Sequence, residues 1–370
     1  GDAESQLQGR RIADTLQIPL VKDTDAVICR GGFVRPEFQK RPQIVLGNIN
    51  NNEAMIPLYA RYLTWADAAY PGNSGYAVRT IRNPFVFAPV NVIALEASDA
   101  EGLQKAVDAF LSSTQLQNKE CRFLSAPHPV LPDSAKQAIA KLKQTLPKFI
   151  RDGAADPSGN TISQYAVAWY LTGDPSFVPA LQAYATNMAD GKSSFPPEHY
   201  YWENTLRAIE LITNSNLLDA ASVAQIDVSL YRSLVQLRKD FGIRRNRERP
   251  GARHQFSPTY SYMMLCDMLL RNLGPAAPET VGKFLATEFN ATSAHFRYIA
   301  DTSYRGSDDS SSTASNMTSI FQALLALGDV TIFNNNLARE GIHRMIATVD
   351  NRGHGCGVGI YEDAYEEGHT

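Results

Sequence analysis

The stretch 125-SAPHPVLPD-133 divides this 370-residue sequence into two parts with different patterns. It holds three prolines, and proline interrupts both helices and the hydrogen bonding of sheets. Before it, short apolar runs alternate with helical patterns, whereas only helical patterns follow it. We therefore predict a linker at 125–133 between an α/β accessory domain, residues 1–124, and a helical catalytic domain, residues 134–370.

The first part has the alternation expected of a small α/β sandwich. Short branched runs bounded by Gly, Pro or Asn predict strands at 26-AVICR-30, 43-QIVLG-47, 76-YAVRTIR-82 and 91-NVIALEA-97. Helical patterns cover about 3–16, 52–64 and 99–115. The last begins at Ser98-Asp99 with Glu101 in its first turn, which suits an N-terminal cap. Since no Gly-x-Gly-x-x-Gly follows a strand, a dinucleotide site is not expected.

The second part consists of amphipathic helical patterns separated by Gly and Pro. They cover about 134–150, 161–172, 176–190, 200–214, 219–239, 256–272, 279–290, 315–328 and 334–349. Short turns predict antiparallel neighbours, and a long succession without heptads or a strict repeat favours an α/α toroid. A plain helical bundle is the alternative. Because the chain ends at 368-GHT-370, directly after a loop with functional residue types, we expect the toroid to be incomplete.

Composition limits the classes of partner. The formal net charge of −3 gives no basic field, so a nucleic-acid partner is not expected, and no apolar run is long enough to span a membrane. The sequence begins with an amphipathic helical pattern, which would suit a secreted or periplasmic bacterial protein after removal of its signal peptide. The four scattered cysteines, Cys29, Cys121, Cys266 and Cys356, lack metal or redox spacing and predict buried free thiols, with one disulfide as the alternative for an exported protein.

Two loops of the helical part carry the residue types that bind sugars and carboxylates. The first, 195-FPPEHYYWEN-204, would offer an aromatic face to a pyranose and hydrogen bonds to its hydroxyls. Its candidates are His199, Tyr201, Trp202, Glu203 and Asn204. The alternative is a helix N-terminus whose aromatic side chains pack inward and whose Glu203 compensates the dipole.

The second loop, 241-FGIRRNRERPGARHQFSPTY-260, contains five arginines, and guanidinium binds a carboxylate in bidentate fashion. Asn246, Arg247 and Arg253 are the candidate carboxylate ligands. His254 and Tyr260 are the candidate proton-transfer pair, with the helix beginning near Pro258. The alternatives are a solvated loop and a structural histidine.

Two further loops add candidates for substrate binding. In 297-RYIADTSYRGSDDSSSTASN-316 these are Tyr304, Arg305 and Asp308, and a flexible loop is the alternative. The segment lacks the alternating oxygen ligands of a calcium loop, so no metal is assigned, although a divalent cation stays open. In 351-NRGHGCGVGIYEDAYEEG-368 a glycine-rich turn presents His354 and Tyr361, without the Gly-Lys-Ser/Thr ending of a phosphate loop. No cofactor is assigned.

Taken together, these residues resemble a known class of enzyme. Trp202-Glu203-Asn204, Asn246, Arg253-His254, Tyr260 and Tyr304-Arg305 on a helical scaffold resemble the α/α-toroid polysaccharide lyases. The segments 43-QIVLGNINNN-52, 75-GYAVRTI-81 and 91-NVIALEASDAEGLQKAVDAFL-111 are similar to the α/β domain that precedes the catalytic domain in some α-glucuronidases and hexosaminidases. The resemblance implies a lyase acting on an acidic polysaccharide or oligosaccharide, with rhamnose–glucuronate linkages as the most specific expectation.

The implied reaction is β-elimination at a uronic acid. The enzyme must neutralise the carboxylate and stabilise the charge that develops as the C5 proton leaves. The arginines would do this, while His254, Tyr260 and the later Tyr304 supply acid and base groups, and the N-terminal half is expected to contribute no catalytic residue. One alternative is a glycoside hydrolase that uses Glu203 with Asp308 or Asp363. The other is a non-catalytic glycan-binding protein.

Overall fold

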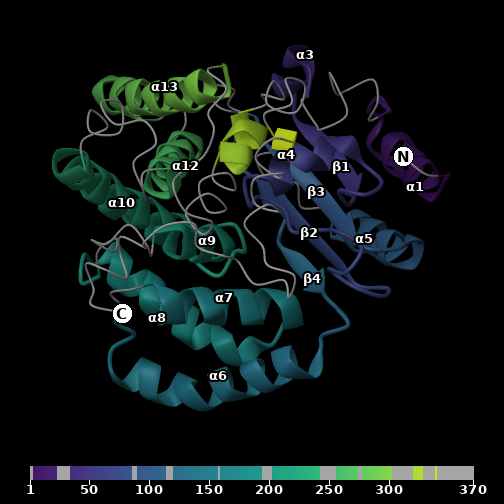
Figure 1. Ribbon diagram of the computed structural model, residues 1–370. Coiled ribbons are helices and arrows are strands. Elements are labelled where there is room, and N and C mark those ends of the chain that lie inside the picture. The colour runs from purple at the N-terminus through teal and green to yellow at the C-terminus, as the bar shows by residue number, and fades with distance from the viewer. Residues whose placement is uncertain are drawn as a thin grey trace, which may run out of the picture.

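The computed structural model in Figure 1 describes most of the chain up to residue 301 and little beyond it. The described residues are 3–22, 34–85, 90–113, 120–156, 159–193, 202–241, 256–273, 277–301, 320–327 and 338–339. The predicted strand 26–30 and most of the predicted helix 334–349 lie outside these residues.

A four-stranded mixed sheet forms the centre of the N-terminal half. Its strands are β1 (Gln43–Gly47), β2 (Tyr76–Ile81), β3 (Val92–Ala97) and β4 (Leu124–Ala126), in the order β1-β3-β2-β4. β3 is parallel to β1 and antiparallel to β2, which in turn is antiparallel to β4. The three described strands predicted from the sequence are confirmed within one residue at each end. Every residue of β3 is buried, including Glu96, as is expected of a central strand that is apolar at its other positions.

Alternate residues of the sheet pack against two different layers, as the period of two in a strand dictates. On one face, Val78 and Leu95 pack with α1 (Ala3–Leu16) and α5 (Ala100–Ser112). The Asp99 side chain caps α5 by accepting from the Gly102 N–H at 2.7 Å, as predicted. On the other face, Ile81 and Ala94 pack with residues of a short helical region.

That short helical region differs from the single helix predicted at 52–64. It consists of a 3₁₀ turn, Glu53–Met55, followed by α4 (Ile56–Tyr59), and a separate short helix, α3 (Pro36–Gln39), precedes β1. The chain leaves the helix after Tyr59, and Tyr62 takes a left-handed backbone conformation with φ 58°. The residues that follow the helix therefore turn toward the second half of the protein.

The start of the predicted linker belongs to the sheet. Residues 124–126 form β4, and beyond them His128 N–H donates to the Pro71 carbonyl at 2.6 Å. Gly72, with φ 92°, lies against the backbone of His128 so closely that a Cβ would collide with it. The proline-rich stretch is thus held along its first half by backbone contacts, and α6 begins at Asp133.

The second half is helical, as predicted. Its elements are α6 (Asp133–Arg151), α7 (Asn160–Thr172), a 3₁₀ turn (Pro175–Phe177), α8 (Val178–Ala189), α9 (Trp202–Thr213), α10 (Ala220–Phe241), α12 (Phe256–Leu273) and α13 (Glu279–Asp301), and residues 320–327 are also helical. α13 runs eleven residues beyond the predicted end at 290, and α12 begins at Phe256, two residues before Pro258.

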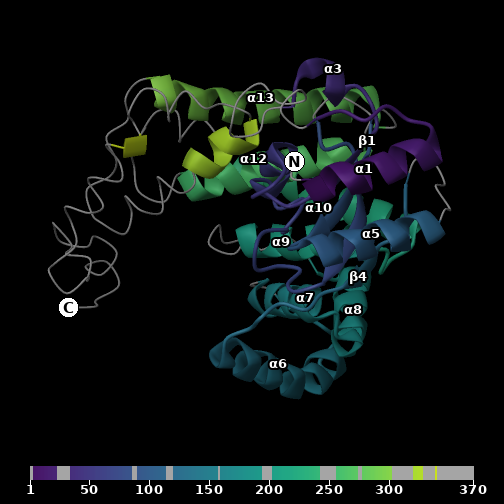
Figure 2. The same cartoon turned by 90° about the vertical axis from the view of Figure 1, so that its right-hand side faces the viewer.

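These helices form two layers. α7 packs against α9 and α9 against α12, whereas α6 packs against α8 and α8 against α10. Figures 1 and 2 show α6 and α13 at opposite ends of this half, with the sheet alongside it. A succession of antiparallel helix pairs places every second helix in the same layer, side by side. The described helices are thus a two-layered array, and closure into a toroid stays a prediction.

Buried polar contacts join the two halves. Tyr70 Oη donates to the Tyr170 carbonyl of α7 at 3.1 Å, and Tyr170 Oη donates to Glu96 Oε2 of β3 at 3.2 Å. Glu96 is fully buried and pairs with Arg79 at 3.0 Å. Burial raises the pKa of Glu96, and the Arg79 charge opposes that rise. Because burying such groups is costly unless they are paired, these contacts specify one orientation of the halves.

The predictions for two of the cysteines and for membrane spans concern residues that the structure describes. Of the predicted buried thiols, Cys121 and Cys266 are free and buried, and Cys29 and Cys356 lie outside the described residues. Among the described helices, none is long and apolar enough to cross a membrane.

Candidate functional site

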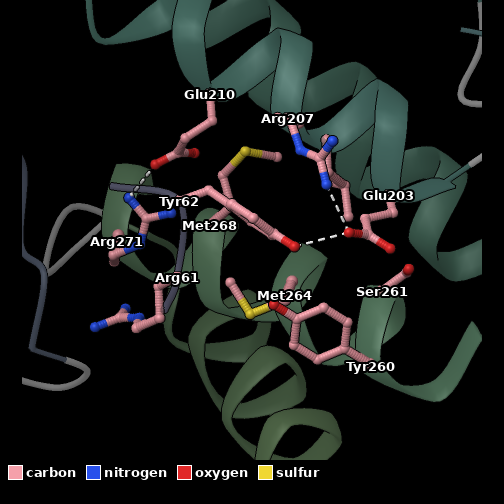
Figure 3. A pocket seen from close by; sticks show the side chains of 11 residues that line it. Arg61, Tyr62, Glu203, Arg207, Glu210, Tyr260, Ser261, Met264, Met268 and Arg271 are labelled. Atoms are coloured by element: carbon pink, nitrogen blue, oxygen red, sulfur yellow. Dashed lines mark hydrogen bonds and ion pairs between the residues drawn. The ribbon is translucent and has the colours of Figure 1, made fainter. Parts of the chain in front are cut away.

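A small cavity lies where the two halves meet, between α9, α12 and the loop that follows α4 (Figure 3). Its volume is about 20 Å³. The lining residues are Arg61, Tyr62, Glu203, Leu206, Arg207, Glu210, Tyr260, Ser261, Met264, Met268 and Arg271. The four residues of α9 in this set have the i, i+3, i+4, i+7 spacing that places side chains on one face of a helix. The cavity thus draws on three segments that are distant in the sequence.

The floor of the cavity is a buried network of two arginines and two carboxylates. Arg61 Nη2 donates to both carboxylate oxygens of Asp267, at 2.6 and 2.8 Å. Arg271 Nε donates to Asp267 Oδ2 at 2.9 Å, and Arg271 Nη1 lies 2.8 Å from Glu210 Oε1. Burial alone would raise the pKa of Asp267, but the charges of Arg61 and Arg271 outweigh it and lower that pKa. Asp267 is therefore held as a carboxylate between the two arginines.

The mouth of the cavity carries a second, more accessible cluster. Tyr62 Oη donates to Glu203 Oε1 at 2.8 Å, and Arg207 Nη2 donates to the same oxygen at 2.7 Å. Gln322 Nε2 donates to Tyr62 Oη at 2.8 Å. The Arg207 guanidinium lies over the Tyr62 ring, 4.6 Å from its centroid, and 5.8 Å from the centroid of Trp65. Burial, with the Glu203 charge second, raises the pKa of Tyr62 to about 12, so its phenol is protonated at neutral pH.

Three buried polar atoms of the lining have neither a hydrogen bond nor an ion pair among the described residues. They are Tyr260 Oη, Ser261 Oγ and Arg207 Nε. Buried polar groups are nearly always satisfied, so three unsatisfied ones around one cavity call for a ligand or water in that space. Burial raises the pKa of Tyr260 well above its ordinary value, so its hydroxyl stays a hydrogen-bond donor. Figure 3 shows the side chains of Tyr62 and Tyr260 pointing into the same space.

Four of the residues predicted for the site can be placed. Glu203 and Tyr260 line the cavity together. Asn204 Nδ2 donates to Asn160 Oδ1 at 2.9 Å and is absent from the lining. Trp202 is only 1% exposed and packs in the helical core, which differs from the predicted sugar platform. The first turn of α9 buries its aromatic side chain inward because the surrounding helices offer an apolar environment, as the alternative account held.

The remaining predicted residues lie outside the described residues. They are His199, Tyr201, Asn246, Arg247, Arg253, His254, Tyr304, Arg305, Asp308, His354 and Tyr361. Their roles stay predictions.

Sequence reasoning missed Arg61, Tyr62 and Arg207. Arg61 and Tyr62 belong to the N-terminal half and line the cavity, whereas the expectation that this half contributes no catalytic residue stays a prediction. Arg207 follows Glu203 by one helical turn, a spacing that brings the two side chains together and that could have indicated it. For Arg61 there was no local signal, since its carboxylate partner lies 206 residues away in the sequence.

A larger cavity of about 590 Å³ lies between α1, β1 and residues 18–21. Arg41 is the single charged side chain among its described lining residues. It therefore lacks the combination of cation, hydroxyls and carboxylate found at the smaller cavity.

No metal site emerges from the part of the chain that the structure describes: it contains no group of three or more His, Cys, Asp or Glu side chains arranged to hold an ion. Comparisons with protein-family models, with curated proteins and with solved structures found no match to this chain.

Proposed function

We propose that this protein is a polysaccharide lyase that cleaves a uronic-acid-containing glycan by β-elimination, with rhamnose–glucuronate linkages as its most specific candidate substrate. The observation that carries the proposal is the convergence of Arg207 Nε, Tyr260 Oη and Ser261 Oγ, buried donors without partners, on one cavity. A cationic donor beside two hydroxyl donors suits an oxyanion, and the carboxylate of a uronic acid is such a group.

The size of the cavity indicates how a substrate would bind. A space of about 20 Å³ holds a single water-sized group, so one carboxylate oxygen fits and a pyranose ring does not. The ring would lie outside, near the partly buried Tyr62 and Trp65, whose aromatic surfaces suit contact with a sugar. The carboxylate would then point inward, toward Arg207.

This placement serves the chemistry of β-elimination. Loss of the C5 proton builds negative charge on the carboxylate, and donors fixed in advance around its oxygen stabilise that charge. Arg207 supplies a full positive charge, and its guanidinium is held in place by Glu203 and by the rings of Tyr62 and Trp65. Tyr260, on the rigid helix α12, supplies a neutral donor.

A glycoside hydrolase has one observation in its favour, since two carboxylates, Glu203 and Glu210, line the same cavity. Both would have to reach one sugar from opposite sides. Glu210 is 8% exposed and is held by Arg271 within the floor network, away from the cavity mouth. The geometry therefore supports the lyase better.

The test is incubation of the protein with a panel of uronate-containing glycans while the ultraviolet absorbance of the unsaturated uronate is followed. The Arg207→Met variant should lose about 10²- to 10³-fold in kcat/KM, the size of effect found for removing one donor to a transition-state oxyanion. Arg232→Met, on the exposed face of α10, is the matched control and should keep wild-type activity. New reducing ends without the absorbance would establish a hydrolase instead, and binding without turnover would establish a glycan-binding protein.

A further inference from the structure

Tyr62 has an unusual backbone for a large aromatic residue. Its φ of 58° lies in the left-handed region, where the Cβ of a bulky side chain is strained. Such strain persists only where the surroundings impose it, and it concentrates at functional sites. Here the Leu63 N–H donates to the Leu58 carbonyl at 2.9 Å and Trp65 Nε1 donates to the Tyr62 carbonyl at 3.3 Å. These contacts hold the turn that directs the Tyr62 side chain to α9.

The hydroxyl of Tyr62 is part of a chain of hydrogen bonds. It donates to Glu203 Oε1 and accepts from Gln322 Nε2, each at 2.8 Å. Arg207 contacts the same Glu203 oxygen, so both of these contacts use Oε1, and Oε2 accepts no hydrogen bond from the described residues. Glu203 is one-third exposed, and a sugar at the mouth of the cavity could reach it.

From this geometry we propose that Tyr62 and Glu203 are the acid and base of the reaction, so that the active site is assembled from both halves of the protein. The proposal rests on the function proposed above and goes further by naming the proton-transfer groups. It also assigns a catalytic role to the N-terminal half.

The step balances without any further reactant. Glu203 takes the C5 proton, the electron pair of that C–H bond forms the C4=C5 double bond, and the C4–O bond breaks. The leaving oxygen takes the phenolic proton of Tyr62. The resulting phenolate lies beside the Arg207 guanidinium, which stabilises its charge. The proton on Glu203 then passes to Tyr62 along their 2.8 Å hydrogen bond and restores the starting state.

Tyr62 is the acid rather than the base because of its surroundings. Burial and the neighbouring Glu203 charge raise its pKa to about 12, so the phenolate needed by a base is scarce at neutral pH. The protonated phenol, in contrast, is available throughout the neutral range. The Glu203 carboxylate accepts the hydrogen bonds of Tyr62 and Arg207 through one oxygen, which positions it as the proton acceptor of the pair.

The experiment compares Tyr62→Phe with Tyr59→Phe on two substrates, a uronate glycan and a uronate that carries a nitrophenoxy group at C4. Tyr59 is the matched control because its hydroxyl also donates to a carboxylate, that of Asp67 at 3.2 Å, but lies outside the cavity lining. Tyr62→Phe should lower kcat on the glycan about 10²- to 10⁴-fold, the usual contribution of an acid catalyst, with little change in KM. Activity on the nitrophenyl substrate should stay near the wild-type value, since that leaving group needs no proton.

A second variant tests the base and guards against a folding defect. Glu203→Gln should lose activity on both substrates, because C5 proton removal is needed in each, and circular dichroism should show that the variants stay folded. If Tyr62→Phe keeps its activity on the glycan, or loses the same fraction of its activity on both substrates, Tyr62 is not the acid. The lyase function is unaffected by that result as long as the wild-type protein forms the unsaturated product. If wild type forms no such product, the proposed function itself is wrong.

Discussion

The buried ion pair between Arg61 and Asp267 makes a quantitative prediction about what holds the two halves together. The side chains are 7% and 2% exposed, and Arg61 also donates to the Pro84 carbonyl. Arg61→Met keeps an apolar stem of similar length and removes the charge. Asp267 then keeps Arg271, whose Nε is 2.9 Å away, as its single cation among the described residues.

Removing one partner of a buried ion pair costs about 3–5 kcal/mol, because the other charge is left without full compensation. Since Arg271 still neutralises Asp267 in part, we expect the lower end, about 3 kcal/mol. The matched control is Arg82→Met, which removes an arginine paired with Glu120 where the side chains are 31% and 34% exposed. Pairs of that kind are worth about 0–1 kcal/mol.

Equilibrium unfolding in urea, followed by far-ultraviolet circular dichroism at pH 7, measures both losses. The pH dependence gives an independent check. Although burial opposes it, the charges of Arg61 and Arg271 lower the pKa of folded Asp267 below its ordinary value, so this carboxylate stabilises the protein above that ordinary pKa. Its contribution is lost as the pH falls through the folded pKa. The gap between wild type and Arg61→Met should therefore narrow below about pH 4. A loss at pH 7 no larger than that of Arg82→Met would refute the reasoning.

Two further substitutions test buried polar groups of the helical half. Tyr260→Phe removes a buried hydroxyl that has no partner among the described residues, so the free energy of unfolding should rise by about 1 kcal/mol while lyase activity falls. If thermal unfolding shows a loss of stability instead, the hydroxyl is hydrogen-bonded in the folded protein. Burial raises the pKa of Asp227 to about 7, against the opposing hydrogen bond from Asn272, so the folded state holds this proton more tightly than the unfolded state. The free energy of unfolding should therefore fall as the pH rises from the ordinary carboxyl pKa of 3.8 to about 7. Asp227→Asn should show a smaller fall over that window in urea titrations, and identical slopes would contradict the assignment.

Local patterns in the sequence were enough to identify most of the secondary structure. The mainly apolar run at 92–97 predicts a central strand because its apolar side chains need apolar neighbours on both faces. Asp99 predicts the start of α5 because a cap satisfies backbone N–H groups only a few residues away. The helices after residue 133 were found for the same reason, since helical periodicity is repeated within each segment.

Where local signals were weak or conflicting, the sequence was less informative. The strand Leu124–Ala126 is three residues long and lies in a proline-rich stretch, and it forms only because β2 offers a free edge. The aromatic side chain of Trp202 suits a sugar surface and a core equally well, and the packing of the surrounding helices decided for the core.

Only the tertiary structure shows which residues come together at the cavity. Glu203 and Tyr260 could be proposed from their chemistry, but Tyr62 reaches Glu203 across 141 residues of sequence and Arg61 reaches Asp267 across 206. Periodicity and capping act over a few residues and contain no information about such distances. The two halves meet because their apolar surfaces bury each other, and the charges at that junction then pair because an unpaired buried charge is too costly.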